Sequence, residues 1–440
     1  MIQLMMRRRT ATSSLLLAGL LTACDKPKPK IQGVQIPVLA ASNDMSVAAD
    51  APAVSLAPAM ALGAWPQSLA NPAHLPGHVA APLGLKPVWT ASVGAAGGYR
   101  QPLQASPVVA GDAVFVLDAD AVLHAVSLHD GSTLWHFDTR PKHASEQNLG
   151  GGIAWDSGRL YATTGYGEVM ALDATAGTVL WRQPLPFPTR TAPTVAAGVV
   201  ALITLNDLMI TFDAVSGTPG WQFSASPGTP SSTAVGVSGA PAFADGIFAA
   251  GFSNGVLAAV DAQSGTPLWE QSLAAGSGQT SQLDFSDIVA APVIADGVVY
   301  AINLSGTFMA VDLHSGVKVW SHGAAGTQAP AMSNGFAFIL DKNQALYAVH
   351  ADDGLVSWSA QLPVYHKPKK KEQPMLWKGP LLVNSTLVLV NDYAQIIFVD
   401  AITGEQKPVQ TLEGFADMPP IAAGGFLLQL TRDATLTAYA

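Results

Sequence analysis

APVIADGVVYAINLSGTFMAVDLHSGVKVW, residues 291–320, is one copy of a phrase that recurs along this chain, roughly APxxxxGxVxxxxxxGxLxAxDxxSGxxxW. A second clear copy is APAFADGIFAAGFSNGVLAAVDAQSGTPLW, residues 240–269. The other copies begin at Ser106, Gly151, Ala192, Ala329, Gly379 and Pro419. The tryptophans that close the copies are Trp135, Trp181, Trp221, Trp269, Trp320 and Trp358, so the period runs from 38 to 51 residues. A period of this size is typical of propellers, solenoids and repeat arrays.

The pattern inside each copy selects the propeller. Each copy contains three short apolar runs, a turn, and a fourth run with the tryptophan, and none of the runs has the 3.6-residue period of a helix. The Asp-x-x-Ser/Thr-Gly step, as in Asp213 to Gly217, supplies a glycine for a hairpin loop that needs a positive φ. We therefore predict an all-β fold in which four antiparallel strands form each blade of a β-propeller.

The ends of the chain predict how the ring closes. The last copy stops at Ala440 after three strands, and a strand-like segment that contains a tryptophan, Lys86 to Thr90, lies at the start of the repeats. We predict that this N-terminal strand completes the last of eight blades, because closure removes the exposed sheet edges. The propeller would then span residues 86–440.

The composition fits this fold and excludes one class of partner. The chain is 49% hydrophobic and 12% charged, with 41 glycines and 31 prolines, as expected for buried strands joined by tight turns. Its formal charge is −9, and removal of residues 1–23, which contain three arginines and no acid, makes it −12. This balance argues against a nucleic-acid partner, which needs a basic surface.

The N-terminus has the features of a secretory signal. A basic stretch, residues 7–9, precedes a short apolar run and then Leu21-Thr22-Ala23-Cys24, which resembles a lipobox. We predict a signal peptide over residues 1–23 and lipid attachment to Cys24, the single cysteine. The alternative is an ordinary signal peptide with a stray cysteine.

Residues 24–85 are rich in alanine and proline and show no apolar periodicity, so we predict a flexible tether. His74 and His78 lie four residues apart within it, separated by proline. Because no third ligand is nearby, we interpret them as ordinary loop residues and predict no metal site.

The phrase A-x-D-x-x-[ST]-G-x-x-x-W resembles the repeat of the pyrroloquinoline-quinone (PQQ) repeat proteins, and the resemblance covers residues 86–440. One branch of these proteins consists of quinoprotein dehydrogenases. The other, BamB, comprises lipoproteins of the outer-membrane β-barrel assembly machinery, and this chain resembles it in lipobox, tether, blade number and length. The stretches 89–94 and 281–288 are the most similar to BamB.

The enzyme branch receives little support from the residues. The resemblance to quinoprotein alcohol dehydrogenases would imply an adjacent cysteine pair and a Ca²⁺ held by Glu, Asn and Asp, yet Cys24 is alone. Ca²⁺ needs six to eight oxygen ligands, and we find no acidic cluster in the inner strands. The repeat aspartates and tryptophans are interpreted as turn and packing residues. We therefore predict no catalytic, cofactor-binding or metal-binding residues and no enzymatic activity.

The predicted working surface consists of the long loops that join blades. The longest connect Trp221 to Pro241, Trp269 to Pro292, and Trp358 to Pro380. Long ordered loops on a rigid scaffold are where binding sites usually lie. The resemblance to BamB implies that the first two contact the barrel-forming subunit of the complex, a BamA-like protein, and that Val235 occupies a position where the family carries arginine. The predicted contact residues are Val235, Asp284, Phe285, Asp287 and Ile288. The alternative is that these are merely blade-joining loops.

The third long loop contains a basic cluster, His366 to Lys371, which would meet anionic lipid, an acidic partner or simply solvent. The resemblance to BamB implies a lipid-anchored monomer within a complex on the periplasmic face of the outer membrane, where it supports the insertion of β-barrel proteins. Asp25, directly after Cys24, resembles an inner-membrane retention signal and leaves that location open. A quinoprotein dehydrogenase and a scaffold for another envelope complex are the alternative functions.

Overall fold

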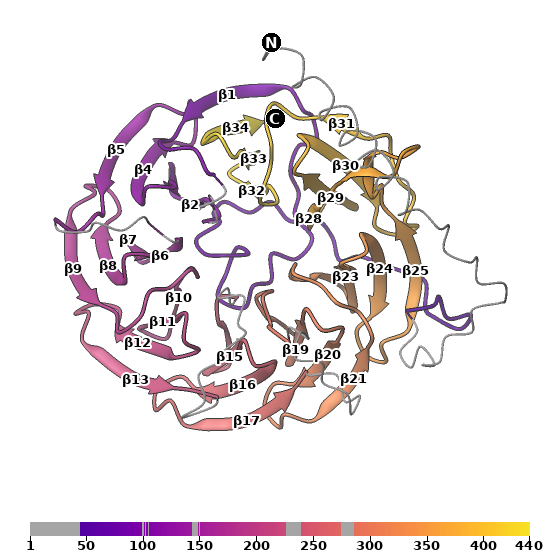
Figure 1. Cartoon of the computed structure of the whole chain (residues 1–440), viewed down its shortest axis with the longest axis horizontal. Helices are drawn as coiled ribbons and strands as arrows, with labels where there is room; N and C mark the ends of the chain where they lie inside the picture. The colour runs from indigo at the N-terminus through magenta and orange to yellow at the C-terminus, as the bar shows by residue number, and fades with distance from the viewer. Residues whose placement is uncertain are drawn as a thin grey trace, which may run out of the picture. The chain divides into compact units, whose positions relative to one another are not determined.

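The computed structural model describes residues 45–98, 101, 103, 105–142, 148, 150–225, 239–273 and 286–440. Within the compact unit from Asn43 to Ala440, the strands form eight four-stranded antiparallel sheets arranged as the blades of a propeller (Figure 1). This confirms the predicted all-β, eight-bladed fold.

The strands follow the chain order of the repeats. Blades 1 to 4 contain β2 (Val108–Ala110), β3 (Ala113–Leu117), β4 (Val122–Ser127) and β5 (Thr133–Asp138); β6 (Gly151–Asp156), β7 (Arg159–Thr164), β8 (Glu168–Asp173) and β9 (Val179–Pro184); β10 (Thr194–Ala196), β11 (Val199–Ile203), β12 (Met209–Asp213) and β13 (Pro219–Phe223); and β14 (Ala242–Ala244), β15 (Ile247–Gly251), β16 (Val256–Asp261) and β17 (Pro267–Ser272). Blades 5 to 7 contain β18 (Val293–Ala295), β19 (Val298–Ile302), β20 (Phe308–Asp312) and β21 (Lys318–His322); β22 (Ala331–Ser333), β23 (Phe336–Leu340), β24 (Ala345–His350) and β25 (Val356–Gln361); and β28 (Trp377–Val383), β29 (Thr386–Asn391), β30 (Gln395–Asp400) and β31 (Gln410–Thr411). A separate hairpin, β26 (Tyr365–Lys367) and β27 (Glu372–Pro374), lies between blades 6 and 7 in the chain.

Blade 8 closes the ring with both ends of the repeat region. It consists of β32 (Ile421–Ala423), β33 (Phe426–Leu430), β34 (Thr435–Tyr439) and, as its outer strand, β1 (Pro87–Ser92). β1 pairs antiparallel with β34, with Trp89 opposite Ala438. The predicted closure by the N-terminal strand is therefore confirmed, and the outer edge of β34 is covered.

A tryptophan on the outer strand of one blade locks onto the aspartate–glycine turn of the next. Trp221 donates its indole N–H to the carbonyl of Ala262 at 2.9 Å, and its ring covers Gly265, whose φ is +70°. A Cβ atom on Gly265 would lie 2.5 Å from the ring, so close packing requires glycine here. The same indole bond joins Trp89 to Leu128, Trp135 to Ala174, Trp181 to Ala214, Trp269 to Leu313, Trp320 to Ala351 and Trp358 to Ala401.

Replacing Gly265 with alanine should destabilise the fold far more than the same change at Gly246. Both glycines lie in turns of blade 4 with similar φ, +70° and +79°, so both variants incur the left-handed strain of about 1–2 kcal/mol. Gly246 has open space around its Cβ position, whereas Gly265 meets the indole, which adds overpacking of about 1–3 kcal/mol. Thermal melting of the two variants tests this, and equal melting temperatures would show that the lock contributes nothing.

Residues 45–85 are an integral part of the propeller, so the prediction of a flexible tether is wrong for this segment. Its trace crosses the centre of the ring in Figure 1, and its backbone or side chains hydrogen-bond to every blade. The bonds join Trp65 to Val109, Pro66 to Trp155, Gln67 to Val195, Pro72 to Phe243, Ala73 to Ile294, Ala57 to Ser333, Val79 to Leu382 and Leu62 to Gly424. These bonds satisfy the backbone of an irregular segment, so it needs neither helix nor sheet periodicity.

The segment attaches at the ends of the inner strands, away from the loops that join blades. Its contacts lie at or beside the first hairpin of each blade, whereas the blade-joining loops enter at the opposite ends of the inner strands. Trp65 is 1% exposed and belongs to the core formed with blades 1, 7 and 8. Residues 45–85 therefore close one mouth of the central channel. The predicted signal peptide, Cys24 and residues 24–44 lie outside the described residues.

The two tether histidines help to hold this segment in place. His74 is buried and pairs through Nδ1 with the carbonyl of Pro292 at 2.8 Å, and burial lowers its pKa to about 4 despite that bond. His78 accepts the N–H of Ser385 at its Nε2, 2.7 Å away. Both therefore join the segment to blades, a role that their spacing in the sequence did not indicate.

Candidate functional site

The face of the propeller that carries the blade-joining loops is the candidate site. The structure describes the two predicted contact loops only where they leave and re-enter the blades, at residues 224–225 and 239–240 and at 273 and 286–290. Val235, Asp284 and Phe285 lie outside the described residues. Their assignment as partner-binding residues stays a prediction.

Asp287 and Ile288 are core residues, so their prediction as partner contacts is wrong. They are 1% and 0% exposed. Ile288 packs against Gly251 and donates its backbone N–H to the carbonyl of Phe252, while the carbonyl of Asp287 accepts the N–H of Leu304. These two residues anchor the loop between blades 4 and 5: Ile288 through burial of its apolar side chain against the adjacent blades, and Asp287 through its backbone hydrogen bond to Leu304.

The predicted basic loop is the hairpin β26–β27. Its turn carries Lys369, Lys370 and Lys371, all exposed. The ring of His366 stacks on that of Tyr393, with centroids 4.8 Å apart and an interplanar angle of 13°, which fixes the hairpin against blade 7. The hairpin therefore holds its positive charges at a defined place on an acidic protein.

A cavity of about 450 Å³ opens at the centre of the ring. Its charged lining residues are Arg190, before β10, Lys378, in β28, and Asp417, before β32. Burial lowers the pKa of the Lys378 ammonium, and the carboxylates of Asp417 and Asp392 oppose that effect. Asp417 also accepts two hydrogen bonds from Arg432, at 2.7 Å and 2.5 Å, so its charge is already paired.

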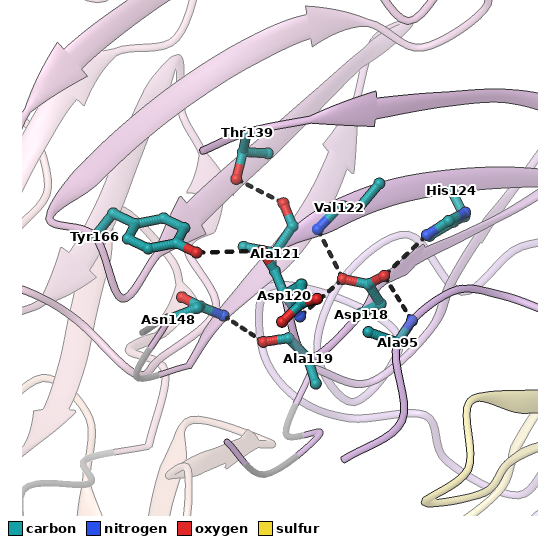
Figure 2. A network of polar contacts seen from close by, with 10 residues as sticks. All are labelled: Ala95, Asp118, Ala119, Asp120, Ala121, Val122, His124, Thr139, Asn148 and Tyr166. Carbon is teal, nitrogen blue, oxygen red and sulfur yellow. Dashed lines mark hydrogen bonds and ion pairs between the residues drawn. The ribbon is translucent and has the colours of Figure 1, made fainter. Parts of the chain in front are cut away.

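Buried polar caps on the turns between the second and third strands are a recurrent feature that our sequence analysis missed. Figure 2 shows Asp118 accepting the N–H groups of Val122, Asp120 and Ala95 at 2.8–3.0 Å, and pairing with His124 at 3.1 Å. The carbonyls of the same turn accept bonds from Thr139, Asn148 and Tyr166 (Figure 2). Asn303, Asp341 and Asn391 cap the equivalent turns of blades 5 to 7.

The sequence signal for these caps is an Asp or Asn that lies four residues before the residue whose backbone N–H it accepts, at the start of the third strand. This spacing suits side-chain capping of a turn. They shape the loop face, because the turns that they hold lie beside the entry points of the inner strands. Among the described residues, no group of three or more His, Cys, Asp or Glu side chains could hold a metal ion. The described residues also contain no helix of the length and apolarity that crossing a membrane requires.

Comparison with known proteins identifies a family. The family described as "Outer membrane protein assembly factor BamB" matches residues 86–148 and 142–360. The BamB of Yersinia pestis is 28% identical over 362 residues, which cover 80% of this chain and 88% of that protein. The crystal structure of BamB from Moraxella catarrhalis superimposes with a TM-score of 0.66 at 18% identity, covering 81% of this chain and 99% of that one. A europium-containing methanol dehydrogenase superimposes with a TM-score of 0.65 at 15% identity, covering 84% and 88%, and shares the fold.

Proposed function

The chain belongs to the BamB family of outer membrane protein assembly factors, and we propose on that premise that it is a scaffold for inserting β-barrel proteins into the outer membrane. The observation that carries this proposal is the family match across residues 86–360, together with a BamB relative that aligns over 80% of the chain. Resemblance of fold alone would not carry it, because dehydrogenases share the propeller.

The proposed mechanism is the presentation of a rigid loop face to the barrel-forming subunit. The indole locks between blades and the segment across the channel support it, because they hold the blade-joining loops on a stiff body. The partner would be a BamA-like subunit, bound through Val235, Asp284 and Phe285, without catalysis. A monomer in the complex would be held at the periplasmic face of the outer membrane by lipid on Cys24.

Replacing Asp284 and Phe285 together with alanine should reduce capture of the barrel-forming subunit at least about tenfold, since aromatic anchors dominate binding energy at interfaces. The measurement is affinity purification of the tagged full-length protein from detergent-solubilised membranes, with the partner quantified by mass spectrometry. The melting temperature of the double variant should match that of the wild type.

The matched control is Val215→Ala, which changes a side chain that is 65% exposed on the turn between β12 and β13, away from the loop face. This variant should capture the partner as the wild type does. Absence of a barrel-forming subunit from the wild-type purification would overturn the proposed function. Normal capture by the double variant would overturn the proposed contact.

A further inference from the structure

Residues at the start of each of the eight repeats line the central cavity: the first residue of seven repeats, and Pro380, the second residue of the copy that begins at Gly379. They are Ser106, Gly151, Ala192, Ala240, Ala291, Ala329, Pro380 and Pro419, each at or just before an inner strand. Because these side chains are small or cyclic, the inner strands do not fill the axis of the ring at this level. On the other side, Trp65, Ser68, Leu69 and Pro76 of the N-terminal segment form a floor. The space is therefore a blind cavity that opens on the loop face.

The walls combine apolar surface with two cations. Leu103, Ile153, Leu381 and Ile421 supply apolar side chains. Arg190 and Lys378 belong to blades 3 and 7, which lie across the ring from each other. Lys378 directly precedes the Gly-Pro step of its repeat, and Arg190 lies two residues before the Ala-Pro step of its own. The charges are thus features of two particular blades, beyond what the repeat needs to fold.

Neither cation is paired with a residue in the part of the chain that the structure describes. The Nε atom of Arg190 is buried without a hydrogen-bond partner, and no hydrogen bond or ion pair links the Lys378 ammonium to another described residue. The nearby carboxylate of Asp417 is engaged by Arg432. Partly buried charges of this kind are unfavourable unless an opposite charge compensates them. The burial that lowers the pKa of Lys378 reflects this cost.

We propose that the central cavity binds a small carboxylate with an apolar body, its negative charge attracted by the unpaired charges of Lys378 and Arg190 and its body packed against Leu103, Ile153 and Leu381. The cavity volume lies in the range of small-molecule sites, which are mostly apolar with a few polar groups that orient the ligand. A carboxylate fits better than a dianionic phosphate, because the carboxylate of Asp417 lines the same cavity and would repel a second negative charge. This site is independent of the proposed scaffold function.

The test is calorimetric titration of the full-length protein with phenylacetate and with its neutral isostere phenylacetamide. We expect saturable binding of the acid with a dissociation constant of about 1 mM or tighter, and binding of the amide at least about tenfold weaker. A leucine-terminated tetrapeptide, with a free or an amidated C-terminus, forms the second arm. Tighter binding of the small acid identifies a free small molecule as the ligand, and tighter binding of the free-acid peptide identifies a chain end.

The variants assign the binding to the two cations. Lys378→Met and Arg190→Leu should each weaken binding of the acid about tenfold or more, whereas Lys370→Met, a matched change in the exposed hairpin, should leave it unchanged. The melting temperature of each variant shows whether it is folded. If one of the two cavity variants does not fold, the binding measured for the other tests the proposal. Equal affinity for acid and amide, no saturation of either acid by about 10 mM, or wild-type affinity in a folded cavity variant would overturn the proposal.

Discussion

Replacing Trp65 with alanine should lower the free energy of unfolding by about 3–5 kcal/mol, the usual cost of removing a large aromatic side chain from a core. Trp65 is among the largest fully buried side chains of the protein, although it precedes the repeats by more than forty residues. Its ring packs in the cluster that includes blades 1, 7 and 8, around the closure formed by β1 and β34. The loss should therefore be largest at the seam of the ring. Thermal and denaturant unfolding of the full chain measure it.

Met60→Ala is the matched control, because Met60 lies in the same segment with 68% of its surface exposed. Surface substitutions of this kind usually change stability by less than about 0.5 kcal/mol. If Trp65→Ala melted at the wild-type temperature, residues 45–85 would be a tether after all, and their contacts with the blades would have no energetic importance.

Replacing Ile288 with alanine should cost about 2–5 kcal/mol, as other large-to-small changes in protein cores do. Ile288 is fully buried in the cluster shared by blades 4 and 5, where its side chain lies against Gly251. The flanking backbone bonds from Ile288 to Phe252 and from Leu304 to Asp287 hold the loop end. Loss of the side chain should loosen this anchor. Partner capture should then fall together with the melting temperature.

Ile402→Ala removes the same atoms from a side chain that is 46% exposed on the turn after β30, and it should leave the melting temperature nearly unchanged. Weaker partner capture by Ile288→Ala at an unchanged melting temperature would contradict our assignment. It would show that Ile288 reaches the partner, as the sequence had suggested.

The blades were predictable because the physical requirements of one blade are repeated eight times. A glycine at positive φ under an indole ring, as at Gly265 and Trp221, tolerates little substitution, so the same letters recur at each interface. The closing strand was predictable because the last repeat lacks a fourth strand. Even the interface between blades 7 and 8 follows this logic. In the described residues it carries no indole lock, because β31, the outer strand of blade 7, contains no tryptophan, and no aspartate–glycine turn joins β34 to β1, the outer strand of blade 8.

The N-terminal segment and the cavity were not predictable in the same way. Residues 45–85 bury Val54, Trp65 and Val79 without any period, since each meets a different part of the ring. Asp287 and Ile288 looked like a mixed polar and apolar contact, and a sequence does not show which side of a loop faces the core. Lys378 and Arg190, 188 positions apart, share a cavity only because the ring brings them together.

If Cys24 carries lipid, as proposed, the docking of residues 45–85 limits how far the propeller can lie from its anchor. Cys24 and Met45 are then separated by 21 residues of chain, which span at most about 70–75 Å when fully extended. A tether that stayed free as far as Lys86 would reach about 200–220 Å. The accessible volume scales with the cube of the reach. The shorter connection to the anchor would therefore raise the local concentration of the propeller near that anchor roughly twentyfold to thirtyfold. With the proposed anchor, the segment that closes one mouth of the channel would thereby also determine how often the loop face meets a partner embedded in the same membrane.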